Sequence, residues 1–160
     1  MEIEEIQEKH FEGIKDLLVE LQEHIVEIDN FHLNILSKDY REKYFEYMLK
    51  DREENQGKVF VATKNEKVVG MIAGFVQNYD TRDKLDYSCP KKGIVAELVV
   101  SKMERCGGVG SMLINAMEKY FKAIGCEYSQ IDVFAQNKTA KEFYDKKGYE
   151  NRMLTMFKKL

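Results

Sequence analysis

The sequence predicts one α/β domain with a mixed, mostly antiparallel central sheet flanked by helices. Three observations lead to this fold class. The chain has 160 residues, the usual size of a single domain. Helical periodicity dominates residues 1–57, and β periodicity begins at residue 58 with two strands that can form a hairpin. After the hairpin, strands and helices alternate, so that helices can cover the sheet.

Residues 1–57 are expected to form a short strand and two amphipathic helices. Ile3 and Ile6 indicate the strand, and residues 8–27 keep apolar side chains at helical spacing. A second helix begins at Asp39, a preferred N-cap residue. Its inward stripe is Tyr40, Tyr44, Phe45, Met48 and Leu49.

Residues 58–160 are expected to contain the hairpin and the alternating elements, with a polar loop at 78–92. The helix at 108–124 has the clearest apolar periodicity, and Gly125 ends it. The expected strands are 58–63, 68–77, 94–100, 129–134 and 153–158, and the second helix of this region is 137–147.

Composition excludes several classes of protein. Apolar residues make up 44% of the chain, too many for a disordered protein. The longest apolar run, 68–76, is far shorter than the ~20 residues that span a bilayer. The first residues show neither the basic nor the apolar region of a signal peptide, so none is expected, and three widely spaced cysteines do not make a disulfide framework. We therefore expect a cytoplasmic protein with no membrane partner.

Charge is unevenly distributed. Residues 1–57 contain 16 acidic and 7 basic side chains, whereas the remainder is net basic. This pattern indicates one cationic and one anionic partner, or acidic helix faces that are simply solvated. The basic part lacks the aromatic interleaving of a nucleic-acid site, so no nucleic-acid partner is expected. His10, His24 and His32 have no ligand at metal spacing and are expected at the solvated surface, with no metal site.

The junction between strand 94–100 and helix 108–124 carries the strongest functional signal. Gly107, Gly108 and Gly110 lie just before or at the start of the helix. Free backbone N–H groups and the helix dipole favour phosphate there, and glycine allows close approach of the anion. The alternative is a tight turn whose glycines serve packing.

Two familiar phosphate motifs do not fit this junction. A Walker loop needs Lys after its last glycine, where this chain has Ser111. A dinucleotide fingerprint from Gly108 needs a glycine at the position of Leu113. A nucleotide-dependent oxidoreductase is therefore disfavoured.

Residues 105–110 read Arg-Cys-Gly-Gly-Val-Gly. Here the sequence resembles the GNAT superfamily of N-acetyltransferases, whose acyl-CoA motif, Arg/Gln-x-x-Gly-x-Gly/Ala, is matched in full. Residues 132–137, followed by Ala140, Phe143, Tyr144, Gly148 and Tyr149, look like the second half of the cofactor site. The resemblance covers about 93–158, whereas before residue 58 only the order of elements agrees.

The resemblance implies the acyl-CoA N-acyltransferase fold, with 1–57 on the acceptor side and 58–160 as the hairpin and acetyl-CoA-binding core. Arg105 begins the phosphate loop, and Leu98 and Val100 offer backbone groups to the pantetheine arm. Asn137 would bond that arm, or would serve only as a helix cap. The pyrophosphate would be held by backbone N–H groups of Cys106, Gly107, Gly108, Val109, Gly110 and Ser111.

The implied reaction is direct attack of a primary amine on the acetyl-CoA thioester. Glu97 is the expected base, because it interrupts an apolar strand; the alternative is a paired structural glutamate. The N–H of Val99 is the expected oxyanion donor. Tyr144 falls where the family places its general acid, although an aromatic residue on such a helix can also be core.

Two further expectations concern function and partners. The same fold could bind acyl-CoA without turnover, as a sensing module. The acceptor is expected to be a small cationic amine or a protein amine, since residues 1–57 are acidic, but the sequence does not identify it. A homodimer is an expectation from the family alone.

Overall fold

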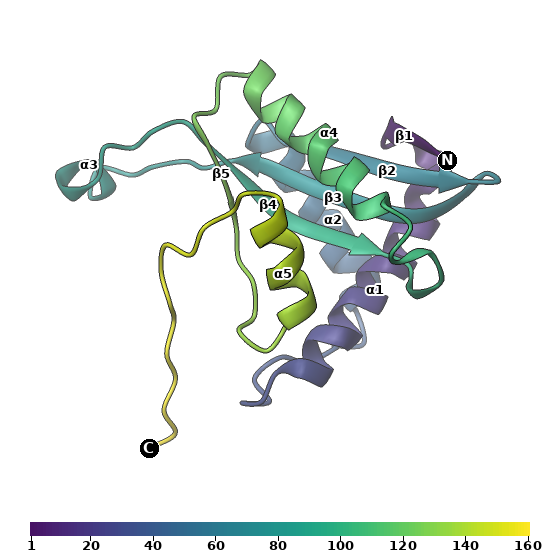
Figure 1. The fold of residues 1–160 in the computed structure, drawn as a ribbon, viewed down its shortest axis with the longest axis horizontal. Helices are drawn as coiled ribbons and strands as arrows, with labels where there is room; N and C mark the ends of the chain where they lie inside the picture. Colours follow the sequence, from purple (N-terminus) through teal and green to yellow (C-terminus); the bar gives the residue numbers. More distant parts are fainter.

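The computed structural model describes all 160 residues and confirms the expected mixed sheet with helices on both faces (Figure 1). The strand order is β1-β2-β3-β4-β5; the first four strands pair antiparallel, and β5 pairs parallel with β4. The strands are β1 (Glu2–Glu5), β2 (Lys58–Lys64), β3 (Lys67–Val76), β4 (Lys92–Val100) and β5 (Tyr128–Ile131). The helices are α1 (Phe11–Ile28), α2 (Tyr40–Glu54), α3 (Asp83–Asp86), α4 (Val109–Ala123) and α5 (Lys138–Lys146), with short 3-10 turns at Glu8–His10 and Lys102–Glu104.

The sheet separates two apolar cores. Helices α1 and α2 cover one face, where Ile14, Leu18 and Phe45 pack against inward residues of β2 and β3. Helix α4 covers the other face with Leu113 and Met117, and α5 joins it there. The apolar periodicity of α1 and α4 therefore marks the buried faces of these helices, as predicted.

The predicted strand at 153–158 is absent. Residues 150–160 form no helix or strand and are exposed along their whole length. β5 is also shorter than predicted and ends at Ile131. A strand needs a neighbour for its backbone groups, and strand-like composition alone does not supply one.

The prediction of solvated histidines is wrong for His10. Its side chain is only 2% exposed, because the turn before α1 folds it under β1. The Nδ1 atom accepts a hydrogen bond from the backbone N–H of Gln7 at 3.1 Å, and Nε2 lies 3.3 Å from Glu4. His32 is exposed, as expected.

No helix in the structure is both long enough and apolar enough to cross a membrane. Groups of three or more His, Cys, Asp or Glu side chains that could hold a metal ion are also absent. The cytoplasmic location and the absence of a metal stay predictions from the sequence.

Candidate active site

Strands β4 and β5 part halfway along β4 and leave one edge of β4 open. β5 pairs only with Lys92–Val95, whereas β4 continues to Val100. On its other edge β4 stays paired with β3, and the N–H of Ser101 donates to the carbonyl of Val69 at 2.9 Å. Hydrogen-bonded pairs alternate along an antiparallel ladder, so the N–H and C=O groups of Leu98 and Val100 point to the open edge.

The backbone N–H and C=O groups of Val99 point the other way, towards β3. Val99 lies across from Met71, two residues from the bonded Ser101, so its N–H points into the sheet towards β3. Its side chain is buried in the core beneath α1 and α2. The expectation that the Val99 N–H faces the reacting carbonyl is therefore wrong, and the adjacent free N–H belongs to Leu98.

A bulge in β4 determines where Glu97 points. Ala73 lies opposite Glu97 and Gly74 lies opposite Val95, so Ala96 is an extra residue in the strand. One extra residue reverses the faces of the side chains that follow it. Val95 therefore packs in the α4 core, whereas Glu97 faces α2.

Glu97 lies in a largely apolar setting with a neutral partner. The hydroxyl of Tyr44 donates a hydrogen bond to its Oε1 atom, and Tyr40 stacks on Tyr44 with ring centroids 4.7 Å apart. Burial raises the pKa of Glu97 to about 6, and the Tyr44 hydrogen bond partly opposes that rise. The Tyr44 hydrogen bond is a pairing of the kind that a structural glutamate would have, so that alternative and the role of a base both stay predictions. A carboxyl group with a pKa near neutrality is suited to proton transfer.

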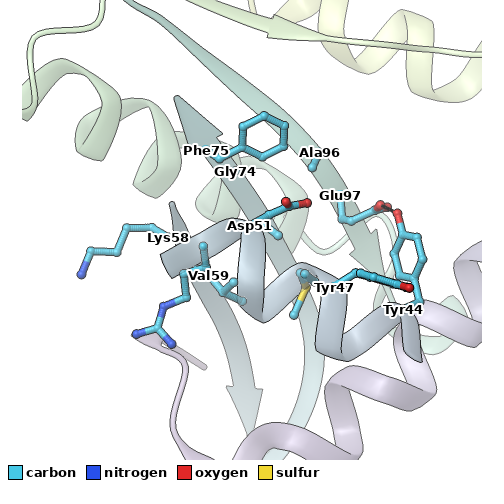
Figure 2. A pocket seen from close by; sticks show the side chains of 12 residues that line it. Tyr44, Tyr47, Asp51, Lys58, Val59, Gly74, Phe75, Ala96 and Glu97 are labelled. Atoms are coloured by element: carbon cyan, nitrogen blue, oxygen red, sulfur yellow. Dashed lines mark hydrogen bonds between the residues drawn. The ribbon is translucent and has the colours of Figure 1, made fainter. Parts of the chain in front are cut away.

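A cavity of about 80 Å³ lies beside Glu97, between α2 and the central strands (Figure 2). Both Asp51 and Glu97 line it. Lys58 is also at its wall, but Figure 2 shows its ammonium group directed away, where it contacts both carboxylate oxygens of Glu5 at 2.7 Å. Arg52 lies 3.7 Å from the same carboxylate. Glu5 is thus paired with both cations and offsets one of their two charges, whereas Asp51 keeps a free carboxylate.

The loop before α4 presents a run of free backbone N–H groups. No N–H from Cys106 to Ser111 donates a hydrogen bond within the chain; the first to do so is that of Met112, to the carbonyl of Gly108 at 3.1 Å. Cys106 and Gly108 have φ values of 64° and 81°, which bend the loop into the helix. These free donors, together with the α4 dipole, form an anion-binding arrangement.

Arg105 fastens this loop to β4 and α1. Its Nε atom donates to the carbonyl of Val100 at 3.0 Å, and its Nη2 atom donates to Glu20 at 3.2 Å. The same Glu20 oxygen accepts from the N–H of Lys102 at 3.0 Å. Glu20 therefore holds both the start and the middle of the connection between β4 and α4.

Asn137 is the N-cap of α5. Its Oδ1 atom accepts from the N–H of Ala140 at 3.1 Å, so the capping role considered from the sequence is present. Its Nδ2 group has no partner in the chain and stays free to donate to another group.

Tyr144 is a core aromatic with an unpaired hydroxyl. Its ring contacts those of Phe143 and Tyr149 at centroid distances of 5.0 and 5.6 Å, and the residue is 8% exposed. Burial raises the pKa of Tyr144, and the nearby Tyr149 and Glu97 add to this effect. At neutral pH the hydroxyl therefore keeps its proton and has no protein acceptor for it.

Comparison with known proteins decides the family. Residues 23–149 match the model of the Acetyltransferase (GNAT) family. The chain belongs to the GNAT acetyltransferase family. This GNAT chain is also 29% identical over 118 residues to an uncharacterised N-acetyltransferase of Methanocaldococcus jannaschii. That match covers 72% of the chain and 47% of the relative, and the chain spans about half the length of the curated relatives it matches.

Solved structures show the same fold. A mutant form of the Bacillus halodurans protein BH1408 superposes with a TM-score of 0.84 at 21% identity, over 100% of this chain and 99% of that one. An aminoglycoside N-acetyltransferase bound to a bisubstrate analogue, CoA-S-monomethyl-acetylneamine, has a TM-score of 0.69 at 18% identity, over 99% and 97% of the two chains.

Three residues of the candidate site have no role in the sequence analysis. It places Tyr44 in the buried stripe of its helix and does not single out Glu20 or Asp51. Each acts through a contact or a cavity shared with a distant part of the chain. The one available signal was Glu97 itself, because a carboxyl group in an apolar strand requires a polar partner.

Proposed function

We propose that this GNAT chain transfers the acetyl group of acetyl-CoA to a primary amine, by direct attack of the amine on the thioester. The observation that carries the proposal is the run of free N–H groups from Cys106 to Ser111 at the end of the open edge of β4. Glu97 lies on the same strand, and its charge is the smallest of the three causes that raise the pKa of the unpaired Tyr144 hydroxyl.

Binding of acetyl-CoA uses backbone groups for the most part. The N–H groups of Cys106–Ser111 receive the pyrophosphate, as helix N-termini receive anions. The C=O of Leu98 and the N–H of Val100 on the open edge bond the amides of the pantetheine arm as an added strand would, and the N–H of Leu98 stays free for the thioester carbonyl. The free Nδ2 group of Asn137 donates to that arm, while Arg105 keeps the loop in place.

Glu97 prepares the acceptor. An alkylamine has a pKa of ~10.4, so its neutral form costs about 4–5 kcal/mol at pH 7, at ~1.36 kcal/mol per pKa unit. The carboxylate of Glu97 takes a proton from the ammonium group, directly or through a water molecule. The nitrogen lone pair then forms a bond to the thioester carbonyl carbon.

Leu98 and Tyr144 complete the transfer. The carbonyl oxygen gains negative charge as the tetrahedral intermediate forms, and the Leu98 N–H on the open edge donates to it. The nitrogen of this intermediate gives up its second proton to solvent, and the intermediate expels the CoA thiolate, which takes a proton from the Tyr144 hydroxyl. Tyr144 then regains a proton from solvent, and Glu97 releases its proton to solvent. The products are an N-acetyl amide and CoA thiol.

We assign the acceptor to the cavity beside Glu97. Asp51 and Glu97 give its wall negative charge, and the cations at its rim are already paired with Glu5. A small cationic amine fits this charge, and so does a protein lysine or amino terminus at the mouth. The aminoglycoside N-acetyltransferase of the same fold acts on a cationic amine, which is consistent with the first class.

The test is release of CoA thiol from acetyl-CoA with a panel of amines: diamines, polyamines, aminoglycosides, and peptides with a free lysine or amino terminus. Release that depends on the added amine, with an acetylated product of the expected mass, supports the transferase. Calorimetric binding of acetyl-CoA without amine-dependent release by any class would instead favour the acyl-CoA sensing module.

A further inference from the structure

Glu20 places a negative charge beside the anion-binding loop, where charge alone would disfavour it. The residue lies on α1, and its carboxylate contacts Lys102 and Arg105, just before the free N–H groups of Cys106–Ser111. Like charges repel, so a carboxylate at this place weakens the attraction of the loop for a pyrophosphate. A group that opposes binding by its charge must be explained by its contacts.

One oxygen of Glu20 holds both ends of the short 3-10 turn that leads into the loop. Its Oε1 atom accepts from the backbone N–H of Lys102 at 3.0 Å and from the Nη2 atom of Arg105 at 3.2 Å. The Glu20 side chain is only 23% exposed, so its ion pair with Arg105 is partly shielded from water. Such a pair restrains the turn more than a fully solvated one would.

Arg105 links this contact to the open edge of β4. Its Nε atom donates to the carbonyl of Val100 at 3.0 Å. A guanidinium group is planar and its donors have fixed directions, so Glu20 and Val100 together fix the orientation of Arg105. The free N–H groups begin at the next residue, Cys106. The position of α1 therefore determines where the loop starts relative to the strand.

The turn has a second attachment that does not involve α1. The Nζ atom of Lys64, at the end of β2, lies 2.8 and 2.9 Å from the two carboxylate oxygens of Glu104. This contact holds the turn between the two positions that Glu20 holds. Loss of Glu20 should therefore loosen the loop without unfolding it.

We propose that Glu20 is a positioning residue for the pyrophosphate of acetyl-CoA. It keeps the loop in the arrangement in which the N–H groups of Cys106–Ser111 can bind the anion together, and this gain in preorganisation outweighs the repulsion of its charge. The apparent dissociation constant rises as the fraction of chains in the competent arrangement falls. The identity of the ligand rests on the proposed function, whereas the contact between α1 and the loop does not.

Isothermal calorimetry with CoA distinguishes positioning from charge by the sign of the effect. Glu20→Ala should weaken CoA binding about 10-fold, the factor expected when the unrestrained loop is competent about one tenth of the time. Glu20→Gln keeps an acceptor oxygen and removes the charge, so it should bind CoA at least as tightly as the parent. Glu23→Ala is the matched control, because Glu23 is an exposed acid on the same helix with no contact to the loop. Unchanged or tighter binding by Glu20→Ala, or equal weakening by Glu20→Gln, would overturn the proposal.

Limited digestion with trypsin tests the contact in the absence of any ligand. Lys102 and Arg105 are the tryptic sites of the loop, and Lys119 in α4 is an internal reference. Glu20→Ala should speed cleavage after Lys102 and Arg105 about 10-fold, because proteolysis follows the population of the opened segment, and should leave cleavage after Lys119 unchanged. Unchanged cleavage in the loop, or equal acceleration at all three sites, would contradict a local hold by Glu20.

The two experiments also keep this inference apart from the proposed function. Absence of CoA binding by the parent chain would refute the proposed function. Equal CoA binding by the parent and Glu20→Ala would refute only the positioning role.

Discussion

Tyr44 on α2 donates its phenolic proton in a hydrogen bond to the carboxylate of Glu97 on β4, across 53 residues of sequence. The contact joins α2 to β4, the strand whose other edge is open beyond Val95 and is proposed to receive the thioester. It also supplies the only hydrogen bond to a carboxyl group that burial has made a weaker acid. The proton affinity of the proposed base is thus set jointly by burial and by one tyrosine.

Glu97→Gln should remove the acid limb of the pH–rate profile. The carboxylate is the active form of a base, so in the parent protein kcat/KM should rise with pH, reach half its plateau near pH 6, and level off above it. The variant should be about 10²–10⁴-fold slower on the plateau, with no inflection near pH 6. Its melting temperature at pH 8 should be no lower, since burial disfavours the charge that is removed. An unchanged inflection in the variant would assign the base to another group.

Tyr44→Phe should move that inflection to higher pH. The hydrogen bond from Tyr44 stabilises the charged carboxylate and lowers the pKa of Glu97, so its loss raises this pKa further. At pH 6 the variant should therefore lose more activity than at pH 8. Tyr40→Phe is the control, because Tyr40 stacks on Tyr44 but makes no hydrogen bond to Glu97. Identical pH profiles for both variants and the parent would show that Tyr44 only packs.

Gly110→Phe should weaken acetyl-CoA binding, whereas Gly110→Ala should change it little. A Cβ atom at Gly110 would lie 3.5 Å from Phe143 and 3.8 Å from Val100, which are ordinary contacts. A phenyl ring would extend into the space between the loop, β4 and α5, where the phosphates and the arm are proposed to lie. Isothermal calorimetry measures both affinities, and circular dichroism checks that α4 still forms. A folded Phe variant with the parent's affinity would refute the phosphate loop.

Tyr144→Phe should slow turnover about 10²-fold without loss of stability. The hydroxyl has no partner in the chain, so its removal leaves no unpaired buried group and almost no change in volume. A thiolate with a reference pKa near 8.5 leaves tolerably unaided, which places the effect at the low end for acid catalysis. The deficit should shrink at lower pH, where solvent acid can substitute. Turnover within about twofold of the parent, with chemistry rate-limiting, would make Tyr144 a packing residue.

Much of this protein follows from local pattern alone. The apolar repeat of α4 and the helix period together predict which face of that helix is buried. The glycines before and at the start of α4 mark where the helix begins, and the first N–H groups of any helix are free. The order of elements was likewise sufficient for the fold class. Each of these properties depends on residues within a few positions of one another, where backbone geometry links sequence directly to structure.

The tertiary structure alone decided which groups meet. A single extra residue, Ala96, turns Glu97 towards α2, and the ladder with β3 engages the Val99 N–H while leaving that of Leu98 free. The residues at 153–158 have the composition of a strand and yet stay unpaired, because strand formation requires an edge that accepts them. Register, bulges and pairing are relations between distant segments, and such relations are settled only when the whole sheet assembles.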